Sequence, residues 1–219
     1  MDRRDLLRWM AAGASATALG CKDDTSGGDD TTTPDAAVDV PDAEPGTPGC
    51  TITRGDAVGP FFEPGAPMRT QLADENEPGT RLEIEVEVVA EGCTDAVAGA
   101  LVDIWQADRD GVYHDATRNY RLRGQVVTPI DGRFTISTIR PGNYEQGPGL
   151  WRPAHLHFTL SHPDYATVTT QLYFAGDQYL PPNDSCTTCT SEDLDRQIEL
   201  TADGAGVEHG TWRVVLRRA

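Results

Sequence analysis

Two histidines separated by a single residue are the clearest candidates for chemistry in this sequence. His155 and His157 lie in the stretch Trp-Arg-Pro-Ala-His-Leu-His-Phe, residues 151–158. In a β-strand, residues two apart point to the same face with Cα atoms roughly 6.5–7 Å apart, so both imidazoles could bind one ion. Leu156 and Phe158 would then face the core. An isolated pair of this kind is as often exposed or hydrogen-bonded, so a metal site requires further donors.

The residues that follow the histidines argue against several common metal sites. After His157 the first acidic residue is Asp164 and the first glutamate is Glu192. A cupin would need a closer glutamate, and a non-haem Fe(II) facial triad would need a carboxylate beside the histidines. A closed zinc site would need the cysteines. Two tyrosines, Tyr113 and Tyr144, instead follow Asp-Gly and Pro-Gly turn signals.

Tyrosine ligands favour ferric iron. A phenol loses its proton near pH 10 in water, so only a strongly Lewis-acidic cation makes phenolate a good ligand at neutral pH. Two phenolates and two imidazoles on Fe(III) leave a net charge of +1 and room for a substrate, and such a centre would activate an electron-rich aromatic ring. Each tyrosine alone is more often an ordinary loop residue. A copper or zinc enzyme and a metal-free binding module therefore remain alternatives.

The elements that must position these side chains are strands. Hydrophobic residues alternate with a period of two, and turn signals separate the short runs. The expected strands cover residues 82–88, 100–105, 121–127, 133–139, 153–160, 168–174 and 212–216. The pattern predicts an all-β fold, an antiparallel β-sandwich with long active-site loops. At most one short helix is expected, over residues 191–198, with Ser191 as its cap and Leu194 and Ile198 packed inward.

The N-terminal residues read as an export signal followed by a linker. Residues 1–21 contain Arg3 and Arg4 ahead of a weakly apolar run that ends at Cys21, as in a twin-arginine signal. Residues 17–21 resemble a lipobox, which predicts a periplasmic or cell-surface protein lipid-anchored at Cys21; cleavage without lipidation is the alternative. Residues 22–49 are an acidic Thr/Pro/Gly/Asp linker expected to be disordered. Residues 50–219 form the domain.

Charge excludes other classes of function. The chain has 35 acidic and 18 basic residues and a net charge of −17, so nucleic acid is not expected as a partner. Lys22 is the only lysine, which excludes a lysine Schiff base or a P-loop lysine in the domain.

The four cysteines of the domain are expected to form disulfides, because an exported protein meets an oxidising compartment. We favour the pairs Cys50 with Cys93 and Cys186 with Cys189. The Cys-Thr-Thr-Cys run could instead be a redox pair or half of a zinc site.

Several motifs together resemble one family, the intradiol ring-cleavage dioxygenases, and most closely the protocatechuate 3,4-dioxygenase type. The resemblance covers nearly all of the domain in order. It runs over residues 59–62 (Gly-Pro-Phe-Phe), 102–107 (Val-Asp-Ile-Trp-Gln-Ala), 110–113 (Asp-Gly-Val-Tyr), 123–124 (Arg-Gly), 138–144 (Thr-Ile-Arg-Pro-Gly-Asn-Tyr), 151–157 (Trp-Arg-Pro-Ala-His-Leu-His) and 170–177 (Thr-Gln-Leu-Tyr-Phe-Ala-Gly-Asp).

This resemblance implies a role for each site residue. Tyr113 would be the tyrosinate that stays on Fe(3+), and Tyr144 the axial tyrosinate that a catechol displaces. His155 and His157 would be the histidine ligands. Tyr120 could rival Tyr113, although the Asp-Gly-x-Tyr context favours Tyr113.

Three further residues match positions around the metal. Arg152 would offset negative charge that develops on the activated substrate. Gln171 occupies the position of a supporting glutamine, and Trp105 would pack behind the metal. The implied reaction inserts both atoms of O₂ between the hydroxyl-bearing carbons of a catechol and gives a cis,cis-muconate-type diacid, with no organic cofactor. The identity of the catechol, and whether the chain forms a homo-oligomer, stay open.

Overall fold

The structure is a computed structural model that describes residues 50–115, 117 and 119–219. The predicted signal, the linker and the lipid site at Cys21 lie outside the described residues. Within the described part of the chain, no helix has the length and apolar character needed to cross a bilayer.

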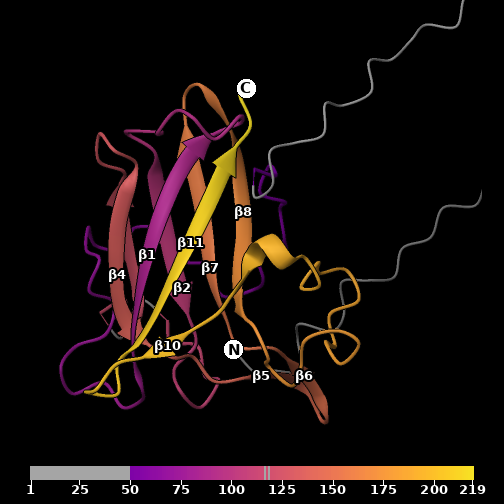
Figure 1. The fold of residues 1–219 in the computed structure, drawn as a ribbon. Coiled ribbons are helices and arrows are strands. Elements are labelled where there is room, and N and C mark those ends of the chain that lie inside the picture. Colours follow the sequence, from indigo (N-terminus) through magenta and orange to yellow (C-terminus); the bar gives the residue numbers. More distant parts are fainter. Residues whose placement is uncertain (1–49, 116, 118) are drawn as a thin grey trace, which may run out of the picture. The chain divides into compact units, whose positions relative to one another are not determined.

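Two sheets pack face to face, which confirms the predicted all-β sandwich (Figure 1). In order of pairing, the first sheet contains β10 (Thr201–Ala202), β11 (Glu208–Leu216), β1 (Arg81–Ala90) and β4 (Arg133–Ile139). The second contains β3 (Arg123–Val127), β2 (Leu101–Gln106), β7 (His155–His162), β8 (Tyr165–Phe174) and β9 (Gln197–Ile198). A separate hairpin pairs β5 (Tyr144–Gly147) with β6 (Leu150–Arg152).

The core lies between the two sheets because each strand alternates its side chains. Every second residue of β1, from Leu82 to Val88, is fully buried. These side chains belong to the same apolar cluster as Leu156 and Phe158 of β7. Burial of one face in this way fixes the register of a strand. Leu156, Phe158 and Leu160 of β7 therefore point inward, and His155 and His157 point to the opposite face.

All seven expected strands are present, but the pairing and the helix differ from the prediction, and the short strands β5, β6, β9 and β10 were not predicted. β1 pairs with β11 in parallel, and β8 pairs with β9 in parallel, so the sheets are mixed. The expected helix is shorter than predicted, a single 3₁₀ turn, η2, over Leu194–Arg196. Its cap is Asp193, whose carboxylate accepts a hydrogen bond from the backbone of Asp195, and not Ser191. Leu194 is 78% exposed, so only Ile198 packs into the core as expected.

The favoured disulfide pairs are both formed. Cys50 bonds to Cys93, which ties the segment before the first strand to the turn after β1. Cys186 bonds to Cys189 within the long loop that connects β8 to η2. This loop and the β5–β6 hairpin both lie at the lower end of the sandwich in Figure 1. The start of β7, with His155 and His157, reaches the same end, so these segments surround the candidate site.

Candidate metal centre

His155 and His157 converge as the strand pattern predicts. Both side chains are buried, and their Nε2 atoms lie 3.1 Å apart. The two residues stand opposite Tyr173 and Gln171 of β8 in the pairing register. Leu156, between them, is fully buried in the core. The sheet therefore fixes both imidazoles on one face, with one ring nitrogen of each aimed at the same point.

Tyr113 completes a triangle of donor atoms with the two histidines. Its hydroxyl oxygen lies 3.1 Å from Nε2 of His155 and 2.9 Å from Nε2 of His157. Two donors that are each about 2.0–2.1 Å from one ion lie roughly 3 Å apart. The three atoms are thus spaced as ligands of one metal ion would be.

A glycine lets the Tyr113 loop reach this position. Gly111 has φ +77°, and a Cβ there would collide with the carbonyl of Asn143. Only glycine tolerates both the left-handed backbone and the close approach. The Asp-Gly turn therefore brings Tyr113 against the chain that enters β5, where Tyr144 lies. The rival Tyr120 is directed elsewhere, since its hydroxyl donates to the carbonyl of Pro64.

Tyr144 shares the pocket but not the hydrogen-bonded triangle. Its ring meets the ring of Tyr113 edge-on, with centroids 5.6 Å apart. In the part of the chain that the structure describes, its hydroxyl has no hydrogen bond to either histidine. It opens β5 and pairs with Arg152 at the end of β6. Tyr144 is consequently carried by a hairpin, whereas the histidines are carried by the central sheet.

The protonation states of these donors suit a Lewis-acidic ion. Burial, followed by the charge of Arg152, lowers the pKa of His155 to about 4, and burial with His155 also lowers the pKa of His157. The Nδ1–H of His155 donates to the carbonyl of Pro153 at 2.6 Å, which leaves the Nε2 lone pair available. Burial raises the pKa of Tyr113, although Arg152 acts in the opposite direction. A bound cation would be needed to hold that phenol as phenolate at neutral pH.

Within residues 50–115, 117 and 119–219, no three His, Cys, Asp or Glu side chains are placed to hold a metal. The further oxygen or nitrogen donor that lies against both histidines is the phenol of Tyr113. Two imidazoles and a phenol are a donor set that suits Fe(III).

The other three predicted residues surround the donors at different depths. Arg152 is buried and lines the pocket. Trp105 stacks on the ring of His157, with centroids 4.7 Å apart and planes 7° apart. Gln171 is fully buried behind the pocket, where its amide donates to the carbonyl of Ala57 at 2.6 Å. It supports the segment that forms one wall, and its predicted part in catalysis stays a prediction.

Two residues that fix Arg152 were missed by the sequence analysis. The guanidinium donates to the hydroxyl of Tyr173 at 3.0 Å and contacts the carboxylate of Asp184. Burial alone would lower the pKa of Arg152, but Tyr173 and Asp184 raise it, so the cation is retained. Tyr173 lies two residues after Gln171, within the family motif of residues 170–177. Asp184 lies in a loop without periodicity, and the neighbouring cysteines were the only signal there.

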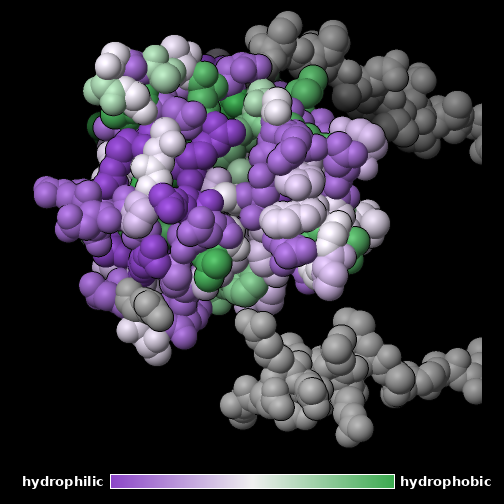
Figure 2. Space-filling model, turned by 90° about the horizontal axis from the view of Figure 1, so that it is seen from below, coloured by the Kyte–Doolittle hydropathy of each residue, from purple (hydrophilic) through white to green (hydrophobic). Residues whose placement is uncertain are grey.

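The pocket in front of the donors has a volume of about 300 Å³, the lower end of the range for small-molecule sites. Phe61 forms part of its wall and stacks on Tyr113 with centroids 4.2 Å apart. Its described lining is Ala57, Gly59, Pro60, Phe61, Tyr113, Tyr144, Gln146, Arg152, His155, His157 and Cys186. Seen from this end of the sandwich, the surface of the molecule is mainly hydrophilic (Figure 2). The pocket could hold a single aromatic ring.

Comparison with known proteins agrees with this geometry. A family model described as Dioxygenase matches residues 57–218. A chlorocatechol 1,2-dioxygenase of Rhodococcus opacus is 34% identical over 72% of this chain and 67% of its own length. The beta chain of a protocatechuate 3,4-dioxygenase of Burkholderia cepacia is 39% identical over 47% of this chain and 48% of its own length. The chain spans 56–58% of four further chlorocatechol 1,2-dioxygenases.

Solved structures give the same family. The dioxygenase domain of a dioxygenase carbohydrate-binding protein fusion from Streptomyces sp. SirexAA-E is 34% identical with a TM-score of 0.65, and the match covers 77% of this chain and all of that one. A 3-chlorocatechol 1,2-dioxygenase from Rhodococcus opacus is 29% identical with a TM-score of 0.68, over 76% of this chain and 73% of that one. The chain therefore belongs to the intradiol ring-cleavage dioxygenases and is an oxidoreductase of that class.

Proposed function

We propose that this chain cleaves a catechol-type ring between its two hydroxyl-bearing carbons, with ferric iron and O₂, to a cis,cis-muconate-type product. The observation that carries the proposal is the triangle of Tyr113 and the two histidines, with donor atoms 2.9–3.1 Å apart. The triangle faces a pocket that also presents Tyr144 and Arg152. Relatives named for the cleavage of chlorocatechols and protocatechuate support the substrate class.

Four side chains would hold the iron. They are Tyr113, Tyr144, His155 and His157, which all line the pocket. When bound, ferric iron supplies a Lewis-acidic centre that favours a deprotonated catechol and makes its ring reactive toward O₂. The protein would position the iron and the substrate, take up the substrate protons and balance the charge around the metal.

Tyr144 is the side chain best placed to take up a substrate proton. Burial raises the pKa of its phenol, although the charge of Arg152 acts in the opposite direction. A phenolate oxygen at this position therefore accepts a proton readily from a catechol hydroxyl. Because Tyr144 lies on the hairpin and not on β7, it can move away without disturbing the histidines.

Arg152 and the aromatic wall complete the site. The guanidinium keeps its charge in a buried setting, where it stabilises negative charge on an activated catecholate. Phe61 stacks on Tyr113 and Trp105 stacks on His157, so an aromatic ring covers one face of each of these two donors.

The charge of the pocket indicates which catechols it would favour. Among the described residues that line it, Arg152 carries the only formal charge at neutral pH, and Asp184 already balances that charge. Because Arg152 serves the catecholate, a ring carboxylate would find no second cation among these lining residues. We therefore expect kcat/KM to be higher for catechol and 4-methylcatechol than for 3,4-dihydroxybenzoate, whereas a preference for the carboxylate would contradict this interpretation.

The function is tested by iron content, colour and turnover of the full-length chain. We expect about one iron per chain and a visible phenolate-to-iron band that moves when catechol is added without O₂. Readmission of O₂ should then yield the ring-opened diacid, identified by mass. A colourless protein that takes up no iron and leaves catechols intact would refute the proposal. A Cu or Zn enzyme would keep its metal and spectrum in Tyr113→Phe, whereas the proposed site would not.

We further propose that the enzyme is exported and lipid-anchored at Cys21. The two disulfides of the domain support an oxidising compartment, and the twin-arginine pattern supports export. Fractionation of cells that express the full chain should place it with the membrane, and Cys21→Ser should release it. Recovery of the unaltered chain in the cytoplasm would contradict both parts.

A further inference from the structure

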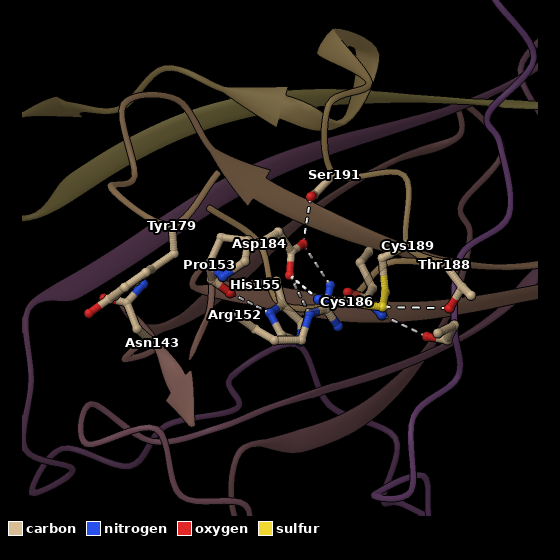
Figure 3. Close-up of polar contacts among 12 residues, drawn as sticks. Asn143, Arg152, Pro153, His155, Tyr179, Asp184, Cys186, Thr188, Cys189 and Ser191 are labelled. Atoms are coloured by element: carbon tan, nitrogen blue, oxygen red, sulfur yellow. Dashed lines mark hydrogen bonds and ion pairs between the residues drawn. A yellow bond between two sulfur atoms is a disulfide. The ribbon is translucent and has the colours of Figure 1, made fainter. Parts of the chain in front are cut away.

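We propose that Asp184 is a positioning residue for the Arg152 guanidinium, and that the Cys186–Cys189 disulfide holds the loop that carries it. Figure 3 shows Arg152, Asp184, Ser191 and the disulfide gathered in one cluster beside His155. The role in turnover rests on the proposed function, because Arg152 acts there on the substrate.

Asp184 contacts two nitrogens of the same guanidinium. Nε of Arg152 donates to Oδ1 at 3.2 Å, and Nη2 reaches Oδ2 at 3.4 Å. The two side chains are only 6% and 3% exposed. A fork of this kind fixes the plane of the guanidinium as well as its position. The orientation of Arg152 in the pocket therefore depends on the position of the carboxylate.

The carboxylate is itself held by its own loop. The backbone N–H of Cys186 donates to Oδ1 at 2.9 Å, and the hydroxyl of Ser191 donates to Oδ2 at 2.6 Å. The backbone N–H of Ser185 donates to the carbonyl of Trp151 at 3.0 Å, which ties the loop to β6 next to Arg152. Each oxygen of Asp184 thus has a donor from the loop in addition to the arginine.

The disulfide closes the turn between these two donors. Cys186 and Cys189 are three residues apart, and their Cα atoms are separated by 5.4 Å. Cys186 also lines the pocket. One residue therefore contributes the pocket wall, the donor to Asp184 and one end of the disulfide. Loosening this turn would shift the wall and the carboxylate together.

Tyr173 holds the other side of the arginine. Its hydroxyl accepts from Nη2 of Arg152 at 3.0 Å and lies 2.8 Å from Oε1 of Gln171. Nε and Nη2 are thereby engaged, and among the described residues Nη1 has no hydrogen-bond partner. With Arg152 lining the pocket, Nη1 is the nitrogen left for the substrate. Asp184 and Tyr173 thus set the direction in which that nitrogen points.

The test separates positioning of Arg152 from a merely structural ion pair by a double-mutant cycle in the iron-loaded full chain. Asp184→Asn should lower kcat about 10- to 100-fold, the range expected when a catalytic group is displaced by about 1 Å, with iron content unchanged and KM altered less than kcat. In the Arg152→Gln background, Asp184→Asn should cause no further loss. Glu192→Gln is the matched control, since it removes an exposed carboxylate from the same loop and should leave kcat unchanged.

Equal losses in both backgrounds would overturn the proposal in favour of a structural role, and so would wild-type kcat in Asp184→Asn. The Cys186→Ser/Cys189→Ser variant should lower kcat in the same direction as Asp184→Asn. Full activity in that variant would overturn the part assigned to the disulfide.

A second measurement does not depend on turnover. In the metal-free full chain, the Nε–H of Arg152, assigned by its loss in Arg152→Gln, should exchange slowly with water in nuclear magnetic resonance spectra. Asp184→Ala should speed this exchange, and Glu192→Gln should not. Unchanged exchange in Asp184→Ala would refute the contact. If the wild-type chain bound no iron and left catechols intact, the proposed function would fail, and this measurement would still decide the positioning of Arg152.

Discussion

Removing one disulfide at a time should separate the stability of the domain from the positioning of the pocket. Cys50–Cys93 joins residues 43 apart, whereas Cys186–Cys189 joins residues three apart. If a disulfide acts by restricting the unfolded chain, the longer loop contributes about 4 kcal/mol and the shorter about 2 kcal/mol. For a domain of this size, that difference of about 2 kcal/mol corresponds to roughly 4–8 °C in Tm.

Loss of the short disulfide should lower activity more than loss of the long disulfide, the reverse of the order expected for stability. The short disulfide belongs to the loop that supplies Cys186 to the pocket and Asp184 to Arg152. The long disulfide ties the turn after β1, away from the donors. The Cys186→Ser/Cys189→Ser variant should therefore lose the larger share of kcat, and the Cys50→Ser/Cys93→Ser variant the larger share of unfolding free energy.

Denaturant unfolding without reductant and turnover at a temperature where both variants are folded provide the assay. The loop-length reasoning would be refuted if Cys186→Ser/Cys189→Ser proved less stable than Cys50→Ser/Cys93→Ser. A variant of Cys50 and Cys93 that stays folded yet loses more kcat would refute the assignment of the pocket wall.

Three further substitutions test the donors and the loop that brings them together. Tyr144→Phe should shift the visible band and slow turnover while iron stays largely bound; an unchanged spectrum would remove Tyr144 from the ligand set. His157→Ala should abolish stoichiometric iron binding, measured by metal analysis, because only one imidazole would remain; retention of iron and colour would count against the triangle. Gly111→Ala should destabilise the domain by about 1–3 kcal/mol, since its Cβ would meet the carbonyl of Asn143. Gly149→Ala is the control for Gly111→Ala, with a similar positive φ but no atom within 4 Å of the added Cβ, and equal losses in the two variants would show that the left-handed backbone alone matters.

The donors could be predicted from the sequence because each depends on a local rule. His155 and His157 share a face through the two-residue period of a strand, and the buried Leu156 between them fixes which face that is. Tyr113 and Tyr144 follow glycine turns, which the structure uses to bring the two loops into contact. The family resemblance then supplied the choice of Tyr113 over Tyr120.

The residues that were missed depend on contacts between distant segments. Asp184 reaches Arg152 across 32 residues, and Asp56 reaches Arg196 across 140. No periodicity marks a carboxylate in a loop as the partner of a particular arginine. The parallel pairing of β1 with β11 is of the same kind, because it joins strands near opposite ends of the described chain. Such pairings follow from the packed fold and not from local propensity.

A second buried ion pair, Asp56 with Arg196, lies next to the residues that hold Arg152. Asp56 and Arg196 have no exposed side-chain surface, and Asp56 also accepts from the hydroxyl of Tyr173 at 2.9 Å. Removing one partner of a buried pair is costly, typically about 3–5 kcal/mol, so the loop segments on both sides of Tyr173 are strongly fixed. His155 and His157 stand on the central sheet, whereas Arg152 stands at the end of β6 in the hairpin and is held by Asp184 of a loop. Substitutions in β7 should therefore act mainly on iron content, and substitutions around Arg152 mainly on turnover.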